Sequence, residues 1–139
     1  MKLAAAIVLV VGLVALALPA RASAPASTVR SFFAALERRD FGGALAFTEG
    51  AAADVITGML DAINREAARR HVDVELRVRS LRVTERGGDG SGQTPVDVAY
   101  DIDVIGKKWI FQKVARHLRG NASFYVDDRE PRIVAIVGM

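Results

Sequence analysis

The hydrophobic and polar positions of the chain change period near its middle, which predicts helices first and strands afterwards. Apolar residues recur at helical spacing over residues 29–36, and a longer stripe of the same kind runs over residues 52–70. Asp40 is a suitable N-cap for a short helix between them, roughly residues 41–48. The Gly42-Gly43 pair weakens that helix by about 1 kcal/mol per glycine relative to alanine. The first half of the domain is therefore predicted to hold three helices.

From residue 72 onward the apolar positions alternate with polar ones, which is typical of half-buried strands. The alternation of residues 72–79 changes phase at Ser80-Leu81, and an extra residue in a β-bulge would explain the change. A second strand is predicted over residues 96–104. The glycine-rich residues 87–92 between the two strands are predicted to form a hairpin loop.

The last third of the chain contains one segment whose periodicity fits two structures. Gly106-Lys107 is a candidate turn, and residues 108–119 after it fit a helix that Gly120 would end about as well as they fit a strand. Residues 122–126 and 133–137 alternate and predict two more strands. The order of elements predicts an α+β fold, in which N-terminal helices pack on a curved antiparallel sheet.

The N-terminal segment has the pattern of a signal peptide. Lys2 precedes an apolar run over residues 3–18, and Pro19 ends it. The small-x-small pattern of residues 20–22 predicts cleavage before Ser23. A retained anchor is the alternative, although a membrane span needs about 20 apolar residues. We expect a signal peptide over residues 1–22, a flexible lead-in over 23–27, one domain over 28–139, and an exported protein that is periplasmic or secreted, with no stable membrane span after cleavage.

The amino-acid composition excludes several kinds of chemistry and one class of partner. The chain has no cysteine, which excludes disulfides, thiol catalysis and zinc–thiolate sites. The formal net charge is +3, but Lys2 and Arg21 lie in the predicted signal peptide, so the mature domain carries about one excess positive charge. Its charges also alternate in sign, whereas a nucleic-acid partner requires a concentrated basic face. We expect no nucleic acid, no metal and no cofactor.

The order of elements resembles that of the nuclear transport factor 2-like superfamily, the cone-shaped α+β domains that include the ketosteroid isomerases. Two segments carry the resemblance. The first is the opening helix, with its aromatic pair Phe32-Phe33 and a polar end that leads to Asp40-Phe41, and the second is the closing strand over residues 131–136. The resemblance implies a sheet wrapped around the helices, an apolar cavity between them, a strand at residues 108–119 and a frequent tendency to form a homodimer through the sheet. No catalytic residue of the family matches a motif in this sequence.

Candidate catalytic residues must therefore be judged on their own chemistry. If residues 108–119 form a strand, His117 shares a face with Trp109, Phe111 and Ala115 and would point into the cavity if that face is concave. An exposed sheet face is the alternative. Asp101 belongs to a trio of aspartates on one strand face, where a carboxylate in an apolar pocket could act as a base. The alternative is that the trio is solvated. The trio comprises Asp97, Asp101 and Asp103.

A cavity between helices and sheet would be lined by large apolar side chains, for which the alternative role is ordinary core. The expected ligand-binding residues are Phe33, Leu36, Met59, Ile63, Trp109 and Phe111. The first hypothesis is a non-catalytic module of the bacterial envelope that binds a small apolar molecule or an envelope protein. The alternatives are a small enzyme of the isomerase, cyclase or dehydratase type, and a structural dimerisation domain. A buried ionisable group beside the cavity would favour the enzyme, and an open apolar cavity would favour ligand binding.

Overall fold

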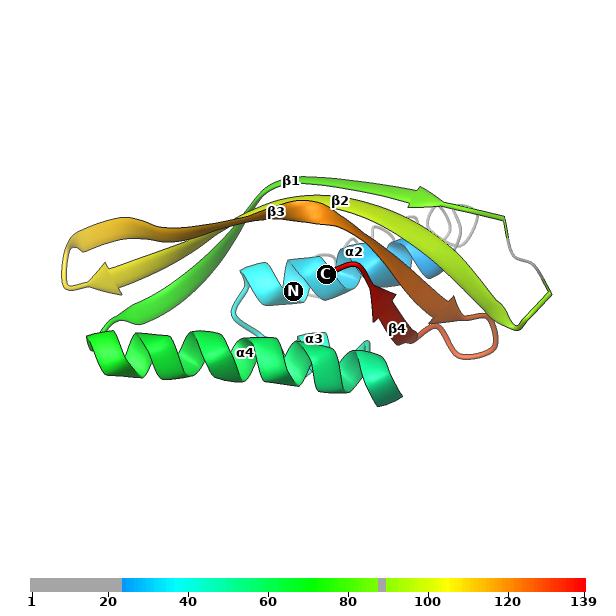
Figure 1. The fold of residues 1–139 in the computed structure, drawn as a ribbon, viewed down its shortest axis with the longest axis horizontal. Coiled ribbons are helices and arrows are strands. Elements are labelled where there is room, and N and C mark those ends of the chain that lie inside the picture. The colour runs from blue at the N-terminus through cyan, green and yellow to red at the C-terminus, as the bar shows by residue number, and fades with distance from the viewer. Residues whose placement is uncertain (1–23, 88–89) are drawn as a thin grey trace, which may run out of the picture.

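The computed structural model describes residues 24–87 and 90–139, which form helices packed on one antiparallel sheet (Figure 1). The predicted signal peptide over residues 1–22 lies outside the described residues. Within the described part of the chain, no helix is long and apolar enough to cross a membrane.

The first described helix, α2, spans Ala24–Glu37 and starts earlier than the sequence pattern predicted. Residues 24–27 are helical, so a flexible lead-in over 23–27 was wrong for these positions. Pro25 is tolerated there because the N–H groups of a first helical turn have no intrahelical acceptor. Thr28 does not cap the helix, since its hydroxyl donates a hydrogen bond back to the carbonyl oxygen of Ala24 at 2.9 Å.

Two further helices follow where the pattern predicted them. Helix α3 spans Phe41–Ala46, and the Asp40 carboxylate accepts a hydrogen bond from the backbone N–H of Gly43 at 2.9 Å, which confirms Asp40 as the N-cap. Helix α4 spans Gly50–Arg70 and is the longest helix described. Its buried positions follow helical spacing and confirm the predicted apolar stripe: they are Ala52, Ile56, Leu60 and Ala67.

Four strands form an antiparallel meander in the order β1-β2-β3-β4, with bounds Asp73–Glu85, Gln93–Lys108, Phe111–Asp127 and Ile133–Val137. The β1–β2 register shifts between Val78 and Ser80, which confirms the predicted β-bulge at the change of phase. Residues 111–119 lie in β3, so the helical alternative for this segment was wrong.

The β2–β3 turn lies further along the chain than predicted. Gly106 and Lys107 belong to β2, which continues to Lys108, and the chain turns at Trp109-Ile110 instead. Trp109 has a φ of 56°, a left-handed conformation that bulky residues rarely adopt. The long β2–β3 pairing therefore runs out to Lys108 and Phe111.

The core lies between the sheet and the helices, which all cover the same face of the sheet (Figure 1). At its centre the rings of Phe32 and Phe33 meet Phe124 of β3, with centroids 6.1 and 5.7 Å away. All three side chains are buried. The last strand is joined to the helices because the backbone N–H of Glu49 donates to the carbonyl oxygen of Ile133 at 2.8 Å. The α+β prediction of helices on an antiparallel sheet is thus confirmed, and the sheet is an open one.

Candidate functional site

An apolar pocket of about 700 Å³ lies between the C-terminal half of α4 and the sheet. Strands β1, β2 and β3 all contribute to its wall, together with Val72 just before β1. The pocket is partly open to solvent. Its larger apolar lining residues are Met59, Ile63, Val72, Val74, Val104 and Leu118.

The pocket exists because the helices do not cover the whole length of the sheet. Helix α2 ends at Glu37 after 14 residues, whereas α4 continues for 21 residues along strands that are themselves long. Several residues that line the gap are small: Ala62 and Ala67 of α4, and Gly106 and Ala115 of the β2–β3 hairpin. Small residues on both walls leave room that larger ones would fill.

The polar groups of the pocket lie at its rim, and positive charge exceeds negative charge among them. Glu66 accepts hydrogen bonds from Arg69 at 2.5 Å and from Arg70 at 2.8 Å. These hydrogen bonds, that of Arg69 above all, lower the pKa of Glu66 and keep it ionised. Arg116 of β3 also lines the pocket, and no ion pair neutralises it within residues 24–87 and 90–139. The rim therefore carries an excess of positive charge beside an apolar interior, and Arg116 is the member without an ion pair in the described residues.

The structure brings together only two of the six expected ligand-binding residues. Met59 and Ile63 line the pocket. Phe33 and Leu36 are 1% exposed and belong to the filled core, so they line no pocket that the structure describes. The expectation for Trp109 and Phe111 was wrong, because they neither line the pocket nor belong to the core.

Trp109 and Phe111 are exposed because the β2–β3 turn lies at residues 109–110, beyond the helices. Their exposed fractions are 89% and 68%. The lining residues that the sequence did not single out include Val74 and Val104. Both lie on the apolar face of their strands, so the alternation of the sequence indicated which way they point. It could not show that the helices leave this end of the sheet uncovered.

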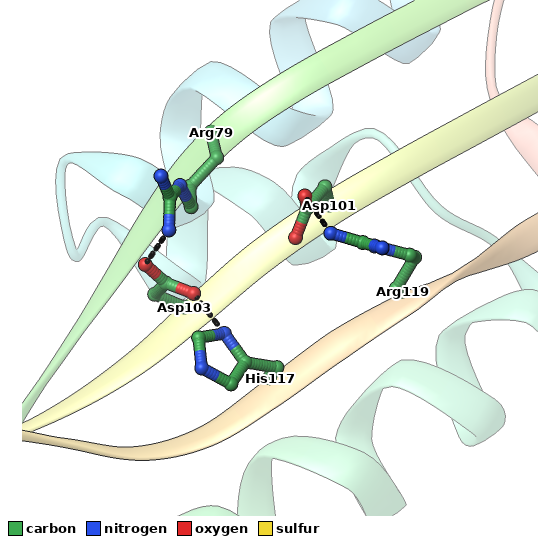
Figure 2. Close-up of polar contacts among 5 residues, drawn as sticks. All are labelled: Arg79, Asp101, Asp103, His117 and Arg119. Carbon is green, nitrogen blue, oxygen red and sulfur yellow. Dashed lines mark hydrogen bonds and ion pairs between the residues drawn. The ribbon is translucent and has the colours of Figure 1, made fainter.

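The aspartate trio lies on the opposite face of the sheet, away from the helices, because the alternate residues of β2 point into the core. Asp103 is the buried member, 5% exposed. Its carboxylate contacts two neighbouring strands, with Oδ1 2.6 Å from His117 Nδ1 and Oδ2 3.5 Å from Arg79 Nη1 (Figure 2). Arg79 reaches it from the β-bulge of β1.

The other two aspartates are also paired across strands. Asp101 accepts a hydrogen bond from Arg119 at 3.1 Å (Figure 2), and Asp97 accepts one from Ser123 at 3.0 Å. The two catalytic candidates, His117 and Asp101, thus have separate partners and neither lines the apolar pocket. His117 is exposed, which agrees with the exposed sheet face that we considered for it. The register shift in β3 accounts for its separation from Ala115, since Ala115 is the extra residue and lines the pocket while His117 faces outward.

No group of three or more acidic or histidine side chains in the described ranges has the geometry of a metal site. The comparisons with known proteins add no relative, because no family profile, curated protein or solved structure matches the chain. Function must therefore be argued from the pocket and from the surfaces of the domain.

Proposed function

We propose that the chain is an exported, non-catalytic binding module whose pocket holds a small apolar molecule with an anionic group. The observation that carries the proposal is the open apolar pocket of about 700 Å³ between α4 and the sheet. Ligand sites are commonly concave, mostly apolar and supplied with a few polar groups that fix orientation, and this volume lies within their usual range. Arg116 at the rim is the group that would pair with an anionic head.

The lining chemistry supports binding over catalysis. Among the residues that line the pocket, the ionisable ones are Glu66, Arg70 and Arg116, and none of them is buried. Acid–base catalysis usually relies on a group whose pKa is shifted toward neutrality by burial or by a like charge. The only resolved shift in this lining lowers the pKa of Glu66, which makes it a poorer base.

The signal-like segment over residues 1–22 supports the exported location, and the helices on a curved meander support placing the domain in the nuclear transport factor 2-like superfamily. Both are part of the proposal. An apolar molecule that crosses an aqueous compartment of the cell envelope needs a protein to shield it, and a pocket of this kind provides the shield.

Calorimetric titration of the full chain with dodecanoate, a linear apolar chain with a carboxylate, tests the proposal. We expect saturable binding with a negative heat-capacity change, which marks burial of apolar surface. Ala67→Leu places a larger side chain in the pocket and should weaken binding, whereas Ala68→Leu adds the same atoms at the next, exposed position of α4 and should not.

Arg116→Gln should weaken dodecanoate binding more than it weakens binding of dodecanol, which lacks the charge. Binding that is equal in the wild type and in Ala67→Leu would contradict the proposal, because the ligand would then lie outside this pocket.

A further inference from the structure

Three consecutive apolar residues stand exposed at the tip of the β2–β3 hairpin. Trp109 and Ile110 are each 89% exposed and Phe111 is 68% exposed. Val114, three residues further along β3, is 42% exposed. Single exposed apolar residues are normal on soluble proteins, but a contiguous group that includes two aromatic rings marks an interaction site. We call residues 109–111 the apolar tip.

Basic side chains surround the apolar tip. Lys107, Lys108, Lys113 and Arg116 flank it, and no acidic residue other than Asp103 occurs between residues 102 and 126. The positive charge of Lys107 is compensated, because its Nζ lies 2.5 Å from Glu75 Oε2. Lys108 and Lys113 are exposed and, within the described residues, form no ion pair. The surroundings of the tip therefore carry a net positive charge.

The position of the tip makes it accessible to a flat surface. Figure 1 shows the β2–β3 hairpin at one end of the molecule, extending past the C-terminal end of α4. Beyond the bulge at Ala115, the β2–β3 pairing continues without a break to the Lys108–Phe111 pair, so the backbone holds the three side chains together at its end. Nothing in the described residues folds over them, as their exposure shows.

We propose that the apolar tip docks the domain on an anionic lipid bilayer. Tryptophan prefers the interface between headgroups and acyl chains, where its ring lies in an apolar region and its N–H reaches polar groups. Ile110 and Phe111 would insert beside it, and Lys108 and Lys113 would face the anionic headgroups. Apolar insertion combined with basic flanks is how peripheral proteins bind membranes reversibly.

A second copy of the chain fits the tip less well than a bilayer does. Two tips that met face to face would bring Lys108 and Lys113 of one copy against the same residues of the other, and like charges repel at such distances. An anionic bilayer supplies the opposite charge and an apolar interior together. The proposal concerns the hairpin alone and is independent of the ligand proposed for the pocket.

The test uses Trp109 as a local reporter, because it is the only tryptophan of the full chain. The full chain is mixed with vesicles of phosphatidylcholine alone or with equal parts of phosphatidylglycerol. We expect the Trp109 emission to shift to shorter wavelength, and to be quenched by lipids with brominated acyl chains, only in the vesicles with phosphatidylglycerol. Residues 3–18 contain no tryptophan, so their own association with lipid does not give the emission shift or the quenching.

Two pairs of substitutions separate the tip from the rest of the surface. Lys108→Glu/Lys113→Glu should lower the ratio of inserted to free tip at least about 25-fold, since each basic residue near an anionic surface contributes roughly fivefold. The control Arg82→Glu/Arg129→Glu reverses two exposed charges away from the tip and should change the ratio far less. Phe111→Ser should also reduce insertion, and Val137→Ser, at another exposed apolar position, should not.

Three results would overturn the proposal. The first is an unchanged Trp109 emission with phosphatidylglycerol vesicles. The second is an equal shift in both lipid compositions that the lysine substitutions leave unaltered. The third is a shift without vesicles that grows with protein concentration, which would assign the tip to contacts between copies of the chain. Loss of dodecanoate binding would leave these readouts untouched, because the pocket is not part of them.

Discussion

Two isoleucines of α4 provide a matched test of where the core ends and the pocket begins. Ile56 and Ile63 lie seven residues apart, two helical turns, and so on nearly the same side of the helix. Ile56 is fully buried in the core. Ile63 is half-buried and lines the pocket. Replacing each by alanine removes the same atoms and changes helix propensity equally, so any difference in stability comes from packing.

The expected magnitudes follow from that difference. Ile56→Ala removes three carbon groups from a closed core, about 2.4 kcal/mol at about 0.8 kcal/mol each. The cavity left behind raises the total cost into the range of about 2–5 kcal/mol. Ile63→Ala enlarges a pocket that is already open and leaves no new closed cavity. We therefore expect it to cost less than about 1.5 kcal/mol, because only the transfer of partly buried groups is lost.

Urea unfolding followed by far-ultraviolet circular dichroism measures both variants. With a slope of about 2 kcal/mol per molar urea, Ile56→Ala should lower the midpoint by at least roughly 1 M and Ile63→Ala by less than about 0.75 M. Equal losses would refute the reasoning, since Ile63 would then be packed as tightly as a core residue and the pocket would be filled in solution.

Three further outcomes follow from single residues. Gly58→Ala should raise the free energy of unfolding by about 1 kcal/mol, measured by the same urea titration, because the position is helical and a Cβ there meets no atom within 4 Å. Asp103→Ala should cost about 1–3 kcal/mol because it removes a buried carboxylate that has two charge-assisted partners, whereas Asp101→Ala removes a less buried carboxylate with one partner and should cost less than about 1 kcal/mol. The hydrogen bond from Lys107 lowers the pKa of Glu75 below its ordinary value of 4.5, so the stability from this pair is complete above that value and is lost as the pH falls through the lowered pKa. Urea midpoints measured from neutral to acidic pH should therefore fall less steeply for Glu75→Gln than for the wild type.

The periodicity of the chain was sufficient to predict most of the fold. Each helix and strand buries one face, so burial leaves a period of 3.6 or 2 in the sequence. The bulge of β1 was predictable for the same reason, because an extra residue shifts the alternation by one position. The pattern cannot show how far the helices extend over the sheet. The boundary between the core at Ile56 and the pocket at Ile63 therefore required the structure.

The predicted position of the β2–β3 turn was the most consequential error, because it led to the expectation that Trp109 and Phe111 line the pocket. Gly106 suggested a turn because glycine tolerates unusual backbone angles, but it lies within β2. The left-handed residue of the actual turn is Trp109, for which such a conformation is uncommon. The hydrophobicity of Phe111 was a second source of error. An apolar side chain is predicted to be buried, but the sequence does not show whether it is buried in the core of its own domain, and Phe111 is exposed.

The short strand β4 leaves part of β3 unpaired, which bears on the tendency of the protein to aggregate. Strand β4 pairs with β3 only over Ser123–Val126, so the outer side of β3 from Phe111 to Asn121 is a sheet edge in the described part of the chain. Unpaired edges of this length can recruit strands of other molecules and start aggregation. Lys113, Arg116 and Arg119 belong to this edge segment and are exposed, and charged side chains on an edge strand are a common means of protecting it. Neutralising these three residues would remove that protection, with visible precipitation at concentrations where the wild type remains clear.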